Sequence, residues 1–393
     1  MRKKLLCLIL AVLMALCIVP ASAFAASQPS ENAAPWEWEQ FAEFVQNNKT
    51  PKEAAAIYKI AAEKYCEYAL EEIFYFGPAS SCYEKAIRLF EDEGMRDEVF
   101  ECYEALGDAA FKLSKYTEAK AAYTKAKEVS ETLDVDEGHL SALNEKFGDV
   151  FMALGEYNEA ARLYSRAIDN ADSSDEAYAS LCLKYAKALE ADGLADDPEG
   201  EMNIAKAFVD AAGILASRGK AEEAIAALKN GAKHYENAGE VESASKAYAS
   251  VILTLAQAGK VDIAASLCFE LYDTYGAKDY TAGLFTNIAT PYYEGIKDYE
   301  SAALAYEKAG DCYKEIDRKD MAKACYEEAA EYYEKAGNSS GAEAMKEKAK
   351  NSFALGSIVS GGNGVLVAIL VFAVLILVAA CIFFKRRQTA SRK

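Results

Sequence analysis

The chain has 393 residues, enough for two or three domains or for one elongated array. It carries 62 acidic and 43 basic residues, and its formal net charge of −19 repels nucleic acid and anionic lipid headgroups. Composition therefore argues against a nucleic-acid partner.

The first 25 residues have the features of a secretory signal peptide. Three basic residues at positions 2–4 precede an apolar run from Leu5 to Val19, and the small-residue site Ala23-Phe24-Ala25 closes the segment. This order of charge, short apolar core and A-x-A site is typical of a cleaved leader. We expect cleavage after Ala25; an uncleaved anchor is the alternative.

Residues 26–50 lead into a repeated pattern that fills residues 51–354. The pattern is an alanine, an aromatic residue four positions later and a second alanine three positions after that. Residues at i, i+4 and i+7 lie on one face of a helix. The close copies begin at Ala54, Ala79, Ala119, Ala160, Ala302 and Ala322.

The spacing of these copies predicts the architecture. Successive copies are commonly about 20 or about 40 residues apart, which fits one helix of about sixteen residues and a tight turn per copy. Glycine appears in several turns, as in "LGEY" at Leu154, because it adopts the left-handed conformation that ends a helix. No segment shows sustained strand alternation. The predicted fold is all-α, an antiparallel helix-hairpin solenoid of about fifteen helices.

Two features interrupt the pattern. An acidic loop from Glu190 to Glu201 contains Pro198 and is longer than the other connections. We interpret it as a solvated insertion that breaks the solenoid into two sub-arrays; a divalent ion or a partner contact is the alternative. Pro291 falls inside an apparent helix and should kink that helix or end it early.

Seven cysteines lie between the two terminal segments. Their odd number, wide scatter and lack of a C-x-x-C motif argue against a disulfide framework and against a zinc site. We interpret them as small buried hydrophobic residues. They are Cys66, Cys82, Cys102, Cys182, Cys268, Cys312 and Cys325.

The C-terminal segment has the pattern of a membrane anchor. Residues 355–364 form a Gly- and Ser-rich linker, and Val365 to Phe384 are twenty residues without a charge. Such a run crosses about 30 Å of hydrocarbon as a helix. The tail 385–393 is basic, and basic residues beside a span stay cytoplasmic. We expect a single-pass protein of a prokaryotic cell membrane, with the solenoid extracytoplasmic and the C-terminus cytoplasmic.

Residues needed for catalysis are scarce. The only histidines, His139 and His234, are far apart in sequence, which leaves little for a catalytic triad or a zinc site. The chain also lacks a phosphate loop, an H-E-x-x-H motif and a G-x-S-x-G motif. We therefore predict that the protein is not an enzyme and has no catalytic residues, metal or cofactor.

Two copies of the pattern, residues 106–126 and 147–167, resemble the tetratricopeptide repeat (TPR). The matching residues are the glycine of the first helix and the alanine and aromatic of the second: Gly107, Ala119 and Tyr123 in one copy and Gly148, Ala160 and Tyr164 in the other. Helix pairs near 40 residues and phrases such as "KAGDCY" are similar to the SNAP-type branch of this superfamily. The resemblance implies a superhelix over roughly residues 50–350.

The resemblance also implies a groove, lined by the first helix of each hairpin, in which such repeats bind protein segments. The corresponding positions are mostly acidic here: Glu101, Glu104, Asp108, Phe111, Glu145, Asp149, Met152, Glu307 and Asp311. An acidic groove with some apolar floor suits a basic or amphipathic segment. The alternative is that an acidic protein carries acids on every face. If Glu104, Asp108, Glu145 and Asp149 line one concave surface as exposed like charges, neutralising all four should leave folding largely intact.

The prediction from the sequence is a non-catalytic, membrane-anchored extracytoplasmic scaffold that binds another protein. A cell-envelope assembly or transport accessory that binds glycan or small ligands is one alternative, since aromatic platforms bind sugars and the chain has 25 tyrosines. A SNAP-like membrane-fusion adaptor is the other alternative. The export signal disfavours it, because SNAP proteins act in the cytosol.

Overall fold

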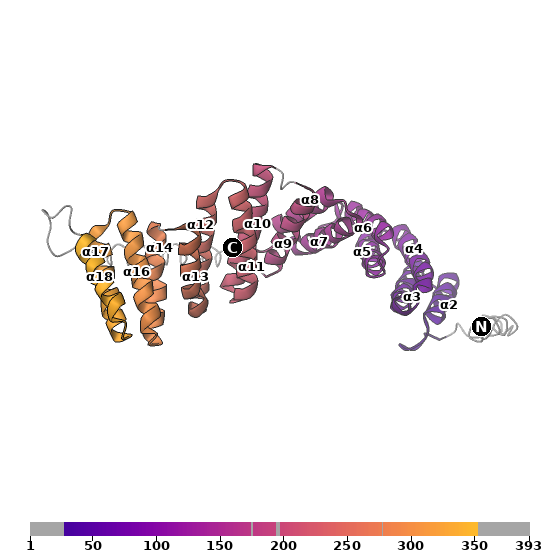
Figure 1. Ribbon diagram of the computed structural model, residues 1–393. Coiled ribbons are helices and arrows are strands. Elements are labelled where there is room, and N and C mark those ends of the chain that lie inside the picture. The colour runs from indigo at the N-terminus through magenta and orange to yellow at the C-terminus, as the bar shows by residue number, and fades with distance from the viewer. Residues whose placement is uncertain (1–26, 174–175, 194–196, 277, 353–393) are drawn as a thin grey trace, which may run out of the picture. The chain divides into compact units, whose positions relative to one another are not determined.

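The computed structural model describes residues 27–173, 176–193, 197–276 and 278–352, and its regular structure there is helical throughout (Figure 1). Sixteen helices follow one another in these described residues when the interrupted helix at residues 279–295 is counted once, and fifteen of them lie after residue 50. The predicted all-α helical-repeat solenoid is thus confirmed.

The predicted terminal segments lie outside the described residues. This applies to the signal peptide at residues 1–25, the transmembrane helix at 365–384 with its linker, and the tail at 385–393. Among the helices that the structure describes, none is both long and apolar enough to cross a bilayer.

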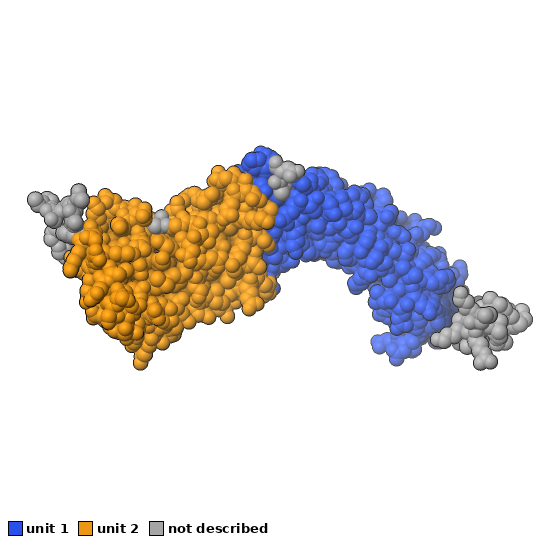
Figure 2. All heavy atoms as spheres, viewed as in Figure 1, with its two compact units in different colours: residues 1–211 blue, residues 212–393 orange. Residues whose placement is uncertain are grey.

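The chain divides into two compact units, Met1–Ala211 and Ala212–Lys393 (Figure 2). The first, unit 1, contains α2 (Pro35–Asn48), α3 (Pro51–Glu71), the short 3₁₀ turn η2 (Ile73–Tyr75), α4 (Phe76–Asp92), α5 (Arg96–Lys112), α6 (Tyr116–Ser130), α7 (Glu137–Leu154), α8 (Tyr157–Asp169) and α9 (Glu176–Ala191). The division falls within α10 (Pro198–Ser217), so it lies beyond the acidic segment 190–201. That segment is also not all loop, since α9 extends to Ala191 and α10 begins at Pro198 and contains the buried Glu201.

The second unit, unit 2, has the same helical character. Its elements are α11 (Ala221–Asn237), α12 (Val241–Gln257), α13 (Val261–Tyr275), α14 (Asp279–Leu284), the π-turn η4 (Phe285–Ala289), α15 (Thr290–Gly295), α16 (Tyr299–Glu315), α17 (Lys319–Lys335) and α18 (Ser339–Ser352).

Successive helices of unit 1 alternate between its two sides. In Figure 1, the helices α3, α5, α7 and α9 follow the inner side of this unit's arc, and α4, α6 and α8 follow its outer side. Each hairpin therefore places its first helix, such as α5 or α7, on the inner side. This is the side on which the sequence predicts a binding groove.

A tyrosine packed against a glycine joins the two helices of three hairpins. A Cβ atom added at Gly107 would lie 2.6 Å from the ring of Tyr123, and one added at Gly148 would lie 2.6 Å from the ring of Tyr164. Gly310 and Tyr326 form the same contact, with a distance of 2.7 Å. These distances are too short for any side chain, so only glycine lets the ring reach the backbone of the first helix. All three rings are buried.

The alanines of the repeated pattern have a matching role. The leading alanine of each close copy is fully buried: Ala54, Ala79, Ala119, Ala160, Ala302 and Ala322. A methyl group at these positions lets a neighbouring helix approach while still removing apolar surface from water. The repeated pattern is therefore the packing surface of the solenoid.

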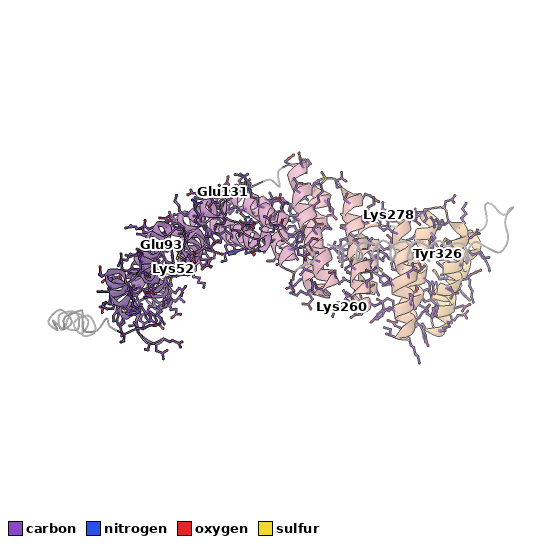
Figure 3. All side chains as sticks on the ribbon, turned by 180° about the vertical axis from the view of Figure 1, so that it is seen from behind. Lys52, Glu93, Glu131, Lys260, Lys278 and Tyr326 are labelled. Carbon is purple, nitrogen blue, oxygen red and sulfur yellow. The ribbon has the colours of Figure 1, made fainter. Side chains whose placement is uncertain are left out.

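Most connections between helices are short, and a residue in the left-handed conformation ends several of the helices. Gly155 ends α7 with φ of 75°, the left-handed conformation expected from "LGEY". Figure 3 labels residues at four other helix ends: Glu93 follows α4, Glu131 follows α6, Lys260 precedes α13 and Lys278 precedes α14.

Pro291 disturbs its helix in a specific way. Proline has no N–H to donate, and its ring would clash with the carbonyl four residues earlier in a regular α-helix. The helix widens into the π-turn η4, where the Thr290 N–H donates to the Phe285 carbonyl five residues back. The predicted disturbance at Pro291 is thus a local π-turn, after which the helix continues to Gly295.

The seven cysteines in the described residues are free thiols, and all but the partly buried Cys66 are buried. Burial raises the pKa of the Cys82 thiol to about 12, so this thiol stays protonated and is a poor nucleophile at neutral pH. The interpretation of these cysteines as small buried hydrophobic residues is confirmed.

The glycine–tyrosine contact gives a first prediction. In Gly148→Ala, the new methyl group forces Tyr164 or α7 to move at a cost of about 1–3 kcal/mol. This exceeds the gain of about 0.5–1 kcal/mol that alanine brings inside a helix. Native-state hydrogen exchange should show α7 and α8 opening more easily.

The matched control is Gly213→Ala in α10, where an added Cβ meets nothing within 4 Å. This variant should be neutral or slightly stabilised. Equal destabilisation of the two variants would contradict the proposed reason for the glycine.

Candidate functional site

Three hairpins contain the same polar cluster, which we call the Glu–Asp–Lys–Tyr cluster. The first helix of the hairpin provides a glutamate and, four residues later, an aspartate. The second helix provides a tyrosine, and a helix beyond the hairpin provides a lysine. The members are Glu104, Asp108, Tyr123 and Lys146; Glu145, Asp149, Tyr164 and Lys184; and Glu307, Asp311, Tyr326 and Lys348.

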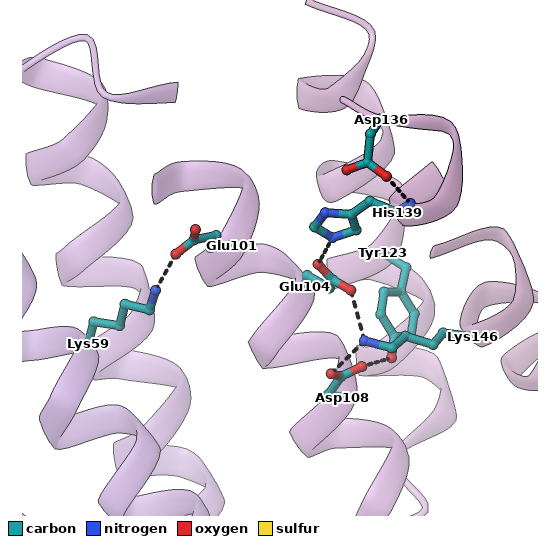
Figure 4. A network of polar contacts seen from close by, with 8 residues as sticks. All are labelled: Lys59, Glu101, Glu104, Asp108, Tyr123, Asp136, His139 and Lys146. Atoms are coloured by element: carbon teal, nitrogen blue, oxygen red, sulfur yellow. Dashed lines mark hydrogen bonds and ion pairs between the residues drawn. The ribbon is translucent and has the colours of Figure 1, made fainter. Parts of the chain in front are cut away.

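The first cluster joins α5, α6 and α7 (Figure 4). The Lys146 Nζ lies 2.8 Å from the Glu104 Oε1 and 2.9 Å from the Asp108 Oδ2. The Tyr123 hydroxyl donates to the other carboxylate oxygen of Asp108. The His139 Nε2 lies 2.8 Å from the Glu104 Oε2, so both oxygens of this glutamate are engaged.

Charge pairing outweighs burial in this cluster. Burial by itself would raise the pKa of Glu104, but its contacts with Lys146 and His139 hold that pKa below its ordinary value. Burial would likewise lower the pKa of Lys146, but hydrogen bonds to Glu104 and Asp108 raise it above its ordinary value. Both side chains are therefore charged at neutral pH, and each stabilises the other.

The second cluster repeats this geometry in α7, α8 and α9. The Lys184 Nζ lies 2.8 Å from the Glu145 Oε1 and 2.7 Å from the Asp149 Oδ1. The Tyr164 hydroxyl donates to Asp149 across 2.7 Å. Since α7 provides Lys146 to the first cluster and these two acids to the second, it links three successive hairpins.

The third cluster belongs to unit 2. The Lys348 Nζ on α18 lies 2.9 Å from the Glu307 Oε1 and 3.0 Å from the Asp311 Oδ1, both on α16. From α17, Tyr326 donates to Asp311 across 2.8 Å and Tyr333 donates to Glu307 across 2.9 Å. The same chemistry therefore fixes hairpins in both units.

These clusters change the interpretation of the predicted groove. Six of its acids belong to the clusters, and the seventh, Glu101, pairs with Lys59 across 2.6 Å (Figure 4). The Glu104 side chain is only 12% exposed. The expectation that Glu104, Asp108, Glu145 and Asp149 are exposed like charges is therefore wrong, because each is paired with a lysine. They bind lysines of the same chain and hold successive helices together.

The lysines were missed from the sequence because they are distant from the acids. They follow the aspartate by 38, 35 and 37 residues in the three clusters. That recurring separation, close to one helix pair, is the sequence signal that could have identified them.

The apolar residues of the predicted groove meet in one shallow hollow of unit 1. Its volume is about 430 Å³, and its lining comes from α5, α7, α8 and α9: Phe111, Asp149, Met152, Ala153, Tyr164, Lys184 and Lys187. The predicted positions Phe111, Asp149 and Met152 are thus brought together. Glu307 and Asp311 belong to the separate cluster of unit 2.

The charge in this hollow differs from the predicted acidic groove. Asp149 already pairs with Lys184, whereas Lys187 is exposed and has no ion pair within the described residues. The floor is apolar, formed by Phe111, Met152 and the Tyr164 ring. The uncompensated charge here is a single ammonium group.

Most tyrosines of the repeated pattern are buried and so cannot serve as a sugar-binding platform. Five of them are at most 2% exposed: Tyr58, Tyr83, Tyr123, Tyr164 and Tyr326. Their rings fill the core, and four of the five hydroxyls donate a hydrogen bond to a polar side chain, namely those of Tyr58, Tyr123, Tyr164 and Tyr326. In the described residues, no group of three or more His, Cys, Asp or Glu side chains is placed to hold a metal ion.

Comparison with known families supports the repeat assignment. Residues 100–132 and 303–336 match the family model of the tetratricopeptide repeat. These segments cover most of the hairpins α5–α6 and α16–α17, which provide the acids and the tyrosine of the first and third clusters. The chain is therefore a helical-repeat protein in which two segments match the TPR model. The finer resemblance to the SNAP-type branch stays a prediction.

Similar solved structures are also repeat proteins. TPR-like repeats from Podosopora anserina share 15% identity over 53% of this chain and 98% of theirs, with a TM-score of 0.36. YrrB, described as a TPR protein with an unusual peptide-binding site, shares 20% identity over 52% of this chain and 97% of its own, with a TM-score of 0.30. The TPR2AB domain of yeast Sti1, in complex with an Hsp90 peptide, shares 15% identity over 76% of this chain and 98% of its own, with a TM-score of 0.31. Sequence identities and TM-scores this low support no inference about what this chain binds.

No curated protein sequence matches the chain.

The network around Glu104 gives a prediction about pH. Because its pKa is lowered in the folded state, its ion pairs stabilise the fold above the ordinary carboxyl pKa of about 4.3, and this stabilisation is lost as pH falls through the lower folded value. At pH 7, Glu104→Gln should lower the free energy of unfolding by about 1–3 kcal/mol relative to the native chain. The difference should shrink towards pH 3, as measured by urea unfolding.

Glu131→Gln is the control, because Glu131 is exposed and has no ion pair in the described part of the chain. It should change the free energy of unfolding by less than about 0.5 kcal/mol at either pH. A Glu104 effect that stayed constant with pH would mean that packing, rather than charge, accounts for it.

Proposed function

We propose that the protein is a non-catalytic, membrane-anchored scaffold that displays its helical repeats outside the cytoplasm and binds a segment of another protein. The observation that carries the proposal is the hollow on unit 1. There, three successive inner helices and the tyrosine of α8 combine an apolar floor with one uncompensated ammonium group. A concave apolar site with a few polar groups is the usual form of a binding site.

The chemistry of the hollow favours an amphipathic segment over a purely basic one. The groove acids already hold lysines of the same chain, so they attract a basic partner less than free carboxylates would. Burying one leucine or phenylalanine side chain of a partner contributes about 1.5–3 kcal/mol. An apolar anchor over Met152, with a carbonyl or carboxylate at Lys187, fits the lining.

The clusters support this role by holding the hollow in shape. Lys184 belongs both to the hollow and to the second cluster, and Tyr164 is fixed by its bond to Asp149. A site whose walls are already ordered loses less entropy when a partner binds. The same contacts therefore serve folding and binding.

The location in the cell rests on the sequence of the two ends. The leader-like residues 1–25 and the uncharged run 365–384 support export and anchoring, and the basic tail supports a cytoplasmic C-terminus.

Protease added to intact cells tests the topology. We expect it to digest the helical repeats and to spare the anchor and tail. A tag placed after Lys393 that was reached by antibody without permeabilising the cells would overturn this orientation.

Photo-crosslinking in living cells tests the binding site. A photoreactive phenylalanine at Ala153, which is exposed and lines the hollow, should give an adduct of one discrete mass. The same residue at Ala121, which is exposed on α6, should not.

Adding Met152→Asp should remove the adduct, because it places an extra charge on the apolar floor. Circular dichroism should show that this variant is still folded. Identical adducts at positions 153 and 121, or none at either, would refute binding at the hollow.

A further inference from the structure

A second surface, at the end of α3, exposes large apolar side chains that do not line the hollow. Nine large hydrophobic residues are exposed in the described residues, and five of them lie in α2, at the end of α3 or in η2. Phe74 is 77% exposed, more than any of the other eight. We call this surface the aromatic patch; it consists of Trp36, Tyr68, Leu70, Ile73 and Phe74.

The path of the chain forces these side chains outward. Helix α3 ends at Glu71, and α4 begins at Phe76, which is buried in the core. The turn η2 lies between them, and none of its three residues is buried. Ile73 and Phe74 therefore point to solvent as a consequence of anchoring Phe76.

The aromatic rings of the patch support one another. The Trp36 and Tyr68 rings meet edge to face with centroids 6.2 Å apart, and Tyr68 meets Tyr75 in the same way at 5.5 Å. The Phe74 ring also meets the Tyr75 ring edge to face, with centroids 5.8 Å apart. Rings held by such contacts form an ordered platform, which is costly to expose to water and loses little freedom when it is covered.

The surroundings of the patch are negative. Glu67, Glu71 and Glu72 alternate with its apolar residues at the C-terminal end of α3, and all three are exposed. None of them forms an ion pair within the described residues, and the last turn of α3 contains no basic residue. The C-terminus of a helix is itself negative, so these carboxylates add to an unfavourable field that a bound cation would relieve.

Charge decides which occupant fits. A second copy of this chain would bring the same carboxylates against their counterparts, and an anionic lipid surface would be repelled. We propose that the aromatic patch binds a basic amphipathic segment of a partner protein. Apolar side chains of that segment cover Trp36, Ile73 and Phe74, and its lysines or arginines face the three glutamates. The proposal is independent of the hollow and of the function proposed for it.

The chain contains its own reporter for a test. Its two tryptophans, Trp36 and Trp38, both lie on α2, and Trp38 is buried whereas Trp36 is 43% exposed. Tryptophan emission of the full chain, held in nanodiscs of zwitterionic lipid, therefore reports on the patch. The probe is an 18-residue helical peptide with a leucine face and a lysine face, free of aromatic residues. Its counterpart has glutamate in place of lysine.

The lysine peptide should shift the emission to shorter wavelength and reduce quenching by acrylamide. It should bind at least about tenfold more tightly than the glutamate peptide, and this difference should shrink as salt is raised through about 0.1 M. Equal affinity of the two peptides, or no shift with either, would overturn the proposal.

Matched variants locate the interaction. Ile73→Ser with Phe74→Ser should weaken binding at least about tenfold, because two apolar contacts are lost. Val241→Ser with Leu253→Ser removes two exposed apolar residues of unit 2 and should leave binding unchanged. Thermal unfolding should show that both variants are folded. Equal weakening by both would contradict the location.

A second pair of variants isolates the charge. Changing Glu67, Glu71 and Glu72 to Gln should weaken binding of the lysine peptide, whereas changing Glu331, Glu343 and Glu347, three exposed acids of unit 2, should not. Both variants have the same net charge, so equal losses would mean that only overall charge matters.

Two further outcomes would overturn the proposal in favour of another occupant. An emission shift that grows with protein concentration alone, together with dimers in sedimentation, would assign the patch to a second copy. A shift on adding zwitterionic vesicles without peptide would assign it to lipid. Neither result affects the crosslinking at Ala153, which tests binding at the hollow. Failure of the aromatic-patch proposal is therefore distinguishable from failure of the proposed function.

Discussion

The contact between a glycine on the first helix of a hairpin and a tyrosine on the second is the constraint from which much of this structure follows. The missing side chain at Gly107, Gly148 or Gly310 lets the ring lie directly on the helix backbone. The ring then delivers its hydroxyl to the aspartate that follows the glycine in sequence. One close approach therefore sets the helix spacing and also places a hydrogen bond at the inner side of the hairpin.

That hydrogen bond leads to the connection between hairpins. Each aspartate also binds a lysine from a helix beyond its own hairpin, and a glutamate one turn earlier binds the same lysine. Partly buried charges of this kind are favourable only when they are paired and hydrogen-bonded, so the register between hairpins is specified as well as stabilised. Side chains that would otherwise make the inner surface acidic are thereby neutralised within the chain.

The consequence for binding is a division of chemistry between two surfaces. In the hollow of unit 1 the carboxylates are paired, and an apolar floor lies beside the uncompensated ammonium of Lys187. At the aromatic patch the carboxylates Glu67, Glu71 and Glu72 have no such partners among the residues that the structure describes, and they lie beside exposed rings. An acidic protein can thus present two sites of different character. The charge that a partner encounters at each site depends on whether the local carboxylates are paired with lysines, not on the net charge of the chain.

The sequence by itself determined the helical fold, the repeating packing face and several helix ends, because these depend on residues four to seven positions apart. The positions implied by the repeat also included Phe111, Asp149 and Met152, which line one hollow in the structure; that this hollow is a binding site stays a prediction. Only the tertiary structure decided that the site's acids hold Lys146 and Lys184, residues 35–42 positions away, because a pair at that distance depends on how hairpins stack. The exposure of Phe74 was likewise decided in three dimensions, since an isolated "EEIFYF" does not reveal which of its aromatic residues the core accepts.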